Sequence, residues 1–232
     1  MKRATLALAL VLTLPFAAQA APITFDISSG DLAAEVTFNN VGGNLVVTLS
    51  NVSTYDVMNP GGVLTAVFFD IAYGLTPISA LLASGSTVWY GPINGGNVGG
   101  EWAYGGSLSS SAPAGSGISS AGLGLFGNAN FNGPNLHDPL AINGGNYGIV
   151  SMGDNPATGN AKVTGGEPLI HYSVVFTLSG IPVGFDPSTG IRNVYLNYGT
   201  DLNYHYTPDG GATLSLLGLA LASIGLLARR RR

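Results

Sequence analysis

The strongest constraint on this chain is a strict alternation of apolar and polar residues. It is clearest over residues 169–179, where one face carries Ile170, Tyr172, Val174, Phe176 and Leu178 and the other carries His171, Ser173, Val175, Thr177 and Ser179. A period of two residues is typical of a strand that buries one of its faces. We therefore predict a single strand over residues 169–179.

The same alternation predicts a hairpin near the N-terminus. Ala34, Val36 and Phe38 alternate with polar residues, and Leu45, Val47 and Leu49 resume the pattern after a turn at Val41-Gly42-Gly43-Asn44. Further strand candidates occupy residues 23–28, 63–73, 87–90, 101–104, 123–126, 147–152 and 194–198, with a turn at 187–190 and a connector or single helical turn at 77–82.

These strands are not accompanied by any comparably clear amphipathic helix between residues 21 and 206. Many short strands with Gly and Pro between them predict an all-β fold. We expect an antiparallel β-sandwich of jelly-roll type with long loops rich in Gly and Asn.

The loops are concentrated in residues 91–166, where 20 of 76 residues are glycine and ten are asparagine. Glycine inside a helix costs about 1 kcal/mol relative to alanine, so turns and short strands are expected here. The aromatic residues Trp102, Phe126, Phe131 and Tyr147 favour ordered loops over a disordered tract.

The N-terminal segment has the layout of a secretory signal peptide. Lys2 and Arg3 precede an apolar run over residues 4–16, and Ala18 and Ala20 place small residues where signal peptidase requires them. We predict a signal peptide over residues 1–20, cleavage before Ala21, and one ectodomain over residues 21–206.

The C-terminal segment has the layout of a membrane anchor. Residues 212–228 are seventeen uncharged residues, and Arg229, Arg230, Arg231 and Arg232 follow them. As a helix the segment rises about 25 Å, the short end of what a bilayer requires. Positive charge stays on the cytoplasmic side, so we predict a transmembrane helix with everything before Thr207 outside. An ordinary tail anchor preceded by a simple turn is the alternative.

Together, the turn, the apolar segment and the arginines resemble a known sorting signal. Pro208, Asp209, Gly210 and Gly211 match the Val-Pro-Asp-Ser/Gly-Gly variant of the PEP-CTERM class of exosortase-dependent bacterial surface proteins, with Thr207 where valine is usual. The resemblance covers residues 207–232. It implies recognition by an exosortase, a membrane processing enzyme, and cleavage near the motif. It further implies a transient anchor in the inner membrane and transfer to the cell surface or extracellular matrix.

Charge and cysteine content exclude several functions. Residues 21–206 hold only Lys162 and Arg192 against eleven carboxylates, a net charge of −9. A nucleic-acid partner needs clustered basic residues and is therefore excluded, and an anionic polysaccharide would be repelled unless cations bridge the two. The chain has no cysteine, which excludes disulfides and thiol chemistry.

Five aromatic residues lie in or beside the glycine-rich segment, namely Trp89, Tyr90, Trp102, Tyr104 and Tyr147. Flat rings with Asn side chains nearby suit the faces and edges of sugars. The alternative, which we favour, is that these rings fill a small core between the loops.

Acidic residues offer weaker candidates. Asp138 and Asp154 lie in predicted loops and carry oxygen ligands that calcium prefers, although Asp and Asn in turns usually serve the turn itself. No other cofactor is indicated. Asp70 and Glu101 form one of many carboxylate pairs that would suit a glycoside hydrolase, which needs two such groups. Gly122, Gly124 and Gly127 have dinucleotide-loop spacing, but no helical pattern follows them.

These features favour a non-enzymatic exported protein of the cell surface or of an exopolysaccharide or biofilm matrix. A carbohydrate-binding module delivered by the same route is the second hypothesis. A secreted glycan hydrolase is the third.

Overall fold

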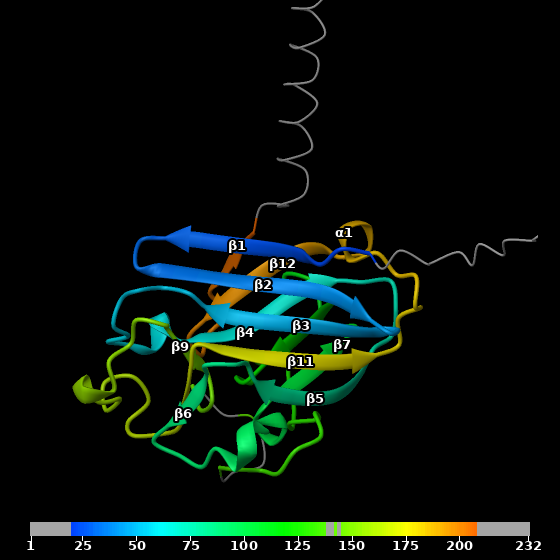
Figure 1. The fold of residues 1–232 in the computed structure, drawn as a ribbon. Coiled ribbons are helices and arrows are strands. Elements are labelled where there is room, and N and C mark those ends of the chain that lie inside the picture. The colour runs from blue at the N-terminus through cyan, green and yellow to red at the C-terminus, as the bar shows by residue number, and fades with distance from the viewer. Residues whose placement is uncertain (1–19, 138–141, 143–144, 208–232) are drawn as a thin grey trace, which may run out of the picture.

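The computed structural model describes residues 20–137, 142 and 145–207, and this part of the chain is mostly β (Figure 1). The predicted transmembrane helix, the motif after Thr207, the signal peptide before Ala20 and Asp138 lie outside the described residues. Within them, no helix is both long and apolar enough to cross a bilayer.

One sheet has five antiparallel strands in the order β1-β2-β3-β11-β5 (Figure 1). Their bounds are β1 Ile23–Ser29, β2 Leu32–Val41, β3 Asn44–Asn51, β11 Ser173–Ser179 and β5 Thr76–Leu82. The predicted hairpin is confirmed, because Val36 faces Leu49 and Phe38 faces Val47 across β2 and β3. All four of these side chains are fully buried, as their alternation requires.

Strand β5 corrects our expectation of a connector or helical turn at residues 77–82. It pairs with β11 along its length, with a register shift between Thr177 and Leu178 where Pro77 pairs. A proline cannot donate to a sheet ladder, so it is accommodated on an edge strand at an irregularity. β5 is half covered, which explains its weak alternation.

The second sheet has eight strands, of which six follow the order β13-β12-β4-β9-β10-β6, while β8 pairs with β4 and β7 pairs with β8. The bounds are β4 Leu64–Asp70, β6 Thr87–Trp89, β7 Ala103–Gly106, β8 Ser116–Ser119, β9 Ile149–Val150, β10 Leu169–His171, β12 Arg192–Tyr198 and β13 Tyr204–Tyr206. β10 runs parallel to β9, which departs from the purely antiparallel prediction.

The strand predicted over residues 169–179 is divided between the two sheets. Tyr172 has a φ of 85°, which a bulky residue adopts only when its surroundings impose it. Before it, β10 belongs to the second sheet, and after it, β11 belongs to the first. Alternation reports burial but not sheet membership, so the sequence pattern continued through the crossing.

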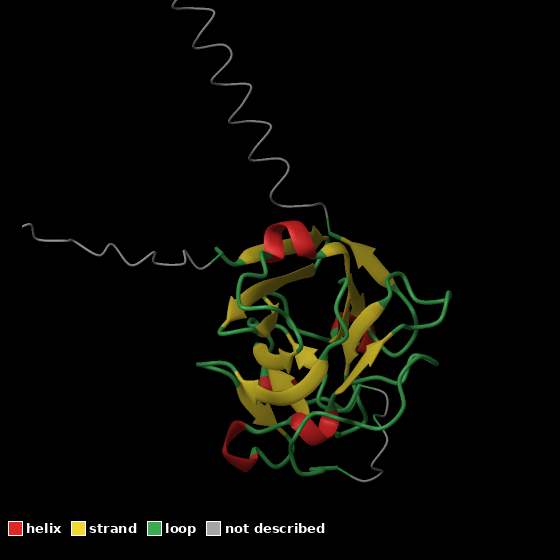
Figure 2. Ribbon diagram, turned by 90° about the vertical axis from the view of Figure 1, so that its right-hand side faces the viewer, coloured by secondary structure: helices red, strands yellow, loops and turns green. Residues whose placement is uncertain are grey.

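The buried side chains of the two sheets form one core. Figure 2 shows strands on either side of this core. Phe38 from β2 packs edge-on against Phe69 from β4, with ring centroids 5.1 Å apart. Helical segments are single turns at the periphery: η1 Pro60–Gly62, η2 Asn94–Gly96, η3 Gly99–Glu101, η4 Pro156–Thr158 and α1 Pro187–Gly190.

The described part of the glycine-rich segment packs onto this core. Trp102 lies 4.9 Å from Phe176 of β11, and Phe131 lies 5.4 Å from the same ring. Residues 123–126, predicted as a strand, form a turn whose Leu125 and Phe126 amides donate to the Gly122 carbonyl. The strand expected at 147–152 is limited to β9, and that expected at 101–104 starts at Ala103.

Candidate functional site

Three of the five aromatic residues considered for glycan contact are core residues. Trp102 and Tyr147 are fully buried, and Tyr104 is 8% exposed. Their ring faces pack against protein, so they have no free face for a sugar. For these three residues, the core-filling alternative is the correct one.

Trp89 and Tyr90, in contrast, reach the surface. The Trp89 ring stacks on His171 at 4.4 Å with the planes 21° apart, and its apolar body packs on a small cluster around Leu169. The Nε2 atom of His171 lies 3.1 Å from the Met152 carbonyl oxygen. The imidazole is thus held between the Trp89 ring and a backbone carbonyl oxygen.

Tyr90 is 43% exposed and is fixed by its hydroxyl, which donates to the Pro156 carbonyl at 2.7 Å. Its backbone has a φ of 64°, a conformation that turns the ring out of β6 toward the loop containing η4. Partial burial, and then the charges of Asp154 and Asp56, raise the pKa of the Tyr90 hydroxyl. The hydroxyl therefore remains a hydrogen-bond donor at neutral pH.

Beside Tyr90, Asp56 and Asp154 clamp two loops together. Asp154 accepts from the Val57 amide at 2.7 Å, and Asp56 accepts from the Asn155 amide at 3.0 Å. The two carboxyl groups also act on each other's ionisation. Each loop thus supplies a carboxylate for the backbone of the other.

The surroundings shift the pKa values of the two carboxyl groups in opposite directions. Burial, and then the hydrogen bond and charge of Asp56, raise the pKa of Asp154 to about 6. The Asn155 amide, followed by Asp154, lowers the pKa of Asp56. Both carboxyl groups already bind backbone amides of the opposite loop, so they hold the two loops together.

A cleft of about 300 Å³ opens beside this clamp. Its lining is rich in oxygen acceptors, with Asp31, Asp56 and Ser53 among them, and it includes the exposed side chains of Tyr55 and Met58. The oxygen acceptors suit the hydroxyl groups of a sugar, and the apolar side chains suit the C–H face of its ring. The sequence did not single out these residues, since their side chains meet only through the fold.

The calcium candidates are not brought together by any described contact. Asp154 is engaged by Asp56 and Val57, and Asp138 lies outside the described residues. Over residues 20–137, 142 and 145–207, no group of three or more acidic or histidine side chains is placed to hold a metal.

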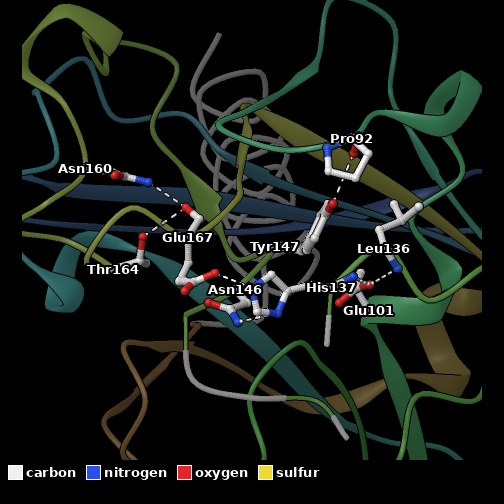
Figure 3. A network of polar contacts seen from close by, with 9 residues as sticks. All are labelled: Pro92, Glu101, Leu136, His137, Asn146, Tyr147, Asn160, Thr164 and Glu167. Carbon is white, nitrogen blue, oxygen red and sulfur yellow. Dashed lines mark hydrogen bonds and ion pairs between the residues drawn. The ribbon is translucent and has the colours of Figure 1, made fainter. Parts of the chain in front are cut away.

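The polar network in Figure 3 is partly buried and holds loops together. Glu101 accepts from the Leu136 amide at 2.5 Å and the His137 amide at 3.0 Å, and His137 forms an ion pair with Glu167. The Tyr147 hydroxyl donates to the Pro92 carbonyl at 3.0 Å. Most of these bonds fix loop backbone.

Burial raises the pKa of Glu101, an effect that the two amides oppose. The carboxylate is only 6% exposed, which leaves little room for a substrate. Asp70, its suggested hydrolytic partner, instead binds the Gly115 amide and the Asn193 side chain, each at 2.7 Å. The two carboxylates therefore belong to separate hydrogen-bond sets.

The residue that begins the predicted sorting motif is docked on the fold. Thr207 is fully buried, and its amide and hydroxyl both donate to the Val194 carbonyl, at 3.0 and 2.9 Å. It follows β13 directly. The first residue of the predicted motif therefore packs against the described β structure.

Compared with protein-family models, curated proteins and solved structures, the chain matches none of them. Functional inference therefore rests on its residues and their geometry.

Proposed function

We propose that this chain is a non-enzymatic exported protein, processed by an exosortase-like enzyme and delivered to the cell surface or to an exopolysaccharide matrix. The observation that carries the proposal is the order of parts after Tyr206: the motif at residues 207–211, an uncharged segment at 212–228 and four arginines. The signal-peptide pattern at residues 1–20 supports export. The ectodomain is proposed to be a jelly-roll-like β-sandwich, which its two sheets and common core support.

Mass spectrometry of the protein from its native host tests this proposal. We expect an N-terminus at Ala21 and a C-terminus within or near residues 207–211, without the apolar segment. An intact tail in a soluble cytoplasmic chain would refute both export and anchoring. An intact tail found only in membranes would retain the anchor and refute processing.

A variant pair sharpens the test. Asp209→Ala changes the motif, and we expect the processed fraction to fall at least tenfold. Asp201→Ala removes an exposed carboxylate that lies before the motif, and processing should continue. Equal processing of the two variants would contradict recognition of the motif.

Binding of extracellular polysaccharide is the second candidate, supported by the acceptor-rich cleft beside Tyr55, by the partly exposed Trp89 and by the exposed Tyr90. We expect co-sedimentation with the host's own polysaccharide and at least a tenfold weaker affinity in Tyr55→Ala. Tyr206→Ala removes an exposed tyrosine elsewhere and serves as the control. Equal affinities of both variants and the wild type would rule out this cleft.

A further inference from the structure

The outer face of the second sheet ends in a cluster of three tyrosines. Tyr195 lies opposite Tyr206 in the β12–β13 pair, and its ring centroid is 5.4 Å from that of Tyr204 and 5.2 Å from that of Tyr206. Tyr204 and Tyr206 are 43% and 51% exposed. These three residues are called the tyrosine face below.

The alternation of the strands separates this face from the core. Val194, Leu196 and Tyr198 of β12 point into the core shared by the sheets, whereas Tyr195 packs with the cluster around Phe68 on the opposite side. Tyr204 and Tyr206 are exposed to solvent on this side. The face therefore offers apolar rings together with accessible hydroxyl groups.

The ring geometry does not suit a sugar. The planes of Tyr195 and Tyr204 are 82° apart and those of Tyr195 and Tyr206 are 57° apart, so neighbouring rings meet at steep angles. A sugar ring stacks on a flat surface, which this arrangement lacks. Tyrosine is instead a preferred residue at the boundary between lipid headgroups and hydrocarbon, where the ring is apolar and the hydroxyl stays hydrated.

The chain length places this boundary within reach. Four residues separate Thr207 from the predicted membrane segment at Ala212, and a fully extended stretch of that length spans about 14 Å. The tether starts from a fixed point, because Thr207 is buried and bonded to Val194. A short tether makes contact with the bilayer effectively intramolecular, so a weak surface affinity is sufficient.

We propose that the tyrosine face docks on the headgroup region of the bilayer while the chain is anchored. The proposal rests on the proposed membrane segment at residues 212–228. The partner is a zwitterionic lipid surface, since the net charge of −9 over residues 21–206 opposes anionic lipid. β13, with the sequence Tyr-His-Tyr, adds no acidic side chain to the face.

The test uses the full chain in phosphatidylcholine vesicles. The chain has no cysteine, so Asn203→Cys and Ala161→Cys each provide a single labelling site, both at exposed positions. An environment-sensitive fluorophore is attached, and quenching by lipids with spin-labelled headgroups is measured. We expect at least threefold stronger quenching at position 203 than at position 161.

A double variant, Tyr204→Ser with Tyr206→Ser, should reduce quenching at position 203 to the level at position 161, with vesicle flotation unchanged. Tyr55→Ser, which removes an exposed tyrosine elsewhere, should leave quenching at position 203 unchanged. Far-ultraviolet circular dichroism checks that both variants remain folded.

Three outcomes overturn the proposal. Chains that float with vesicles but show equal quenching at both positions refute docking alone. Chains that do not float refute the membrane segment, and docking with it. Protection of position 203 by a neutral polysaccharide, without quenching by lipid, would assign the face to a glycan instead.

Discussion

The β2–β3 hairpin and the glycine-rich segment bury aromatic side chains in the same core but are held by different means. In the hairpin, backbone pairing extends from Ala34 and Asn51 to the turn. In the glycine-rich segment, side chains replace much of that ladder. The Asn130 side chain accepts a hydrogen bond from the Tyr104 amide and donates one to the Tyr104 carbonyl, both at 2.8 Å. The Glu101 carboxylate accepts hydrogen bonds from the amides of residues 136 and 137.

Close backbone approach is the second difference. A Cβ atom on Gly100 would overlap the Pro134 carbonyl, and one on Gly153 would overlap the Thr54 carbonyl. Several glycines of the segment are therefore packing residues as well as turn residues. A regular alternation of apolar and polar residues thus gives ordered β structure in the hairpin. In the glycine-rich segment, order comes from side chains that bind backbone groups and from close backbone packing at glycines.

The largest test of this comparison uses one core ring from each region. Trp102→Ala and Phe38→Ala should each lower the free energy of unfolding by about 3–5 kcal/mol, since both remove a fully buried ring. Urea denaturation followed by circular dichroism gives both values. A loss below about 1 kcal/mol for Trp102→Ala alone would show that the glycine-rich segment is not part of the cooperative unit.

The sequence predicted the hairpin because its buried residues alternate on one face through both strands. It missed β5, which is half covered and begins with Thr76-Pro77, and it joined β10 to β11 across Tyr172. Alternation identifies a buried face, but it does not report where a chain crosses between sheets. The short strands β7 and β9 were predicted with inexact bounds, and β8 was not predicted, because such short strands are fixed mainly by their neighbours.

The second test concerns the glycines. Gly100→Ala should lower the free energy of unfolding by about 1–3 kcal/mol, because the added methyl group meets fixed backbone. Gly127→Ala is the matched control, since a Cβ there meets nothing within 4 Å and its φ is not positive. It should be neutral or stabilise by up to about 1 kcal/mol. If Gly100→Ala and Gly127→Ala give similar free energies of unfolding in urea titrations, the close backbone contact at Gly100 does not stabilise the fold.

The candidate site was predictable only in part. Trp89 and Tyr90 were identified as aromatic residues beside a polar segment, and the structure leaves both partly exposed. Their neighbours Asp56 and Asp154 lie far apart in sequence and meet through two loops, a contact that no local pattern encodes. Burial of Trp102 and Tyr147 was likewise set by the packing of distant strands.

The third test concerns the amide side chain that replaces a ladder. Asn130→Ala should lower the free energy of unfolding by about 1 kcal/mol, because two bonds to Tyr104 backbone are lost at a site that water partly reaches. Asn128→Ala, at an exposed position in the same loop, should have little effect. Hydrogen exchange of the Tyr104 amide gives an independent readout, and unchanged protection in Asn130→Ala would contradict the assignment.

The smallest expected effect is electrostatic and lies at the Asp56–Asp154 clamp, which joins the loop after β3 to the glycine-rich segment. The pKa of Asp154 is raised to about 6, so the folded chain holds this proton more tightly than the unfolded chain does. The free energy of unfolding should therefore fall as pH rises through the window from about 4 to about 6. Partial solvent exposure reduces the expected change to about 1 kcal/mol.

Asp154→Asn isolates this charge, because an amide oxygen can still accept from the Val57 amide. Urea titrations at pH 4, 5, 6 and 7 should give a shallower decline for Asp154→Asn than for the wild type. The slope should not vanish, because burial also raises the pKa of Glu101, which acts in the same direction. The lowered pKa of Asp56 acts oppositely, since its contribution is lost as pH falls below the window. Asp201→Asn is the control and should keep the wild-type slope. If Asp154→Asn also keeps the wild-type slope, ionisation of Asp154 does not lower the free energy of unfolding.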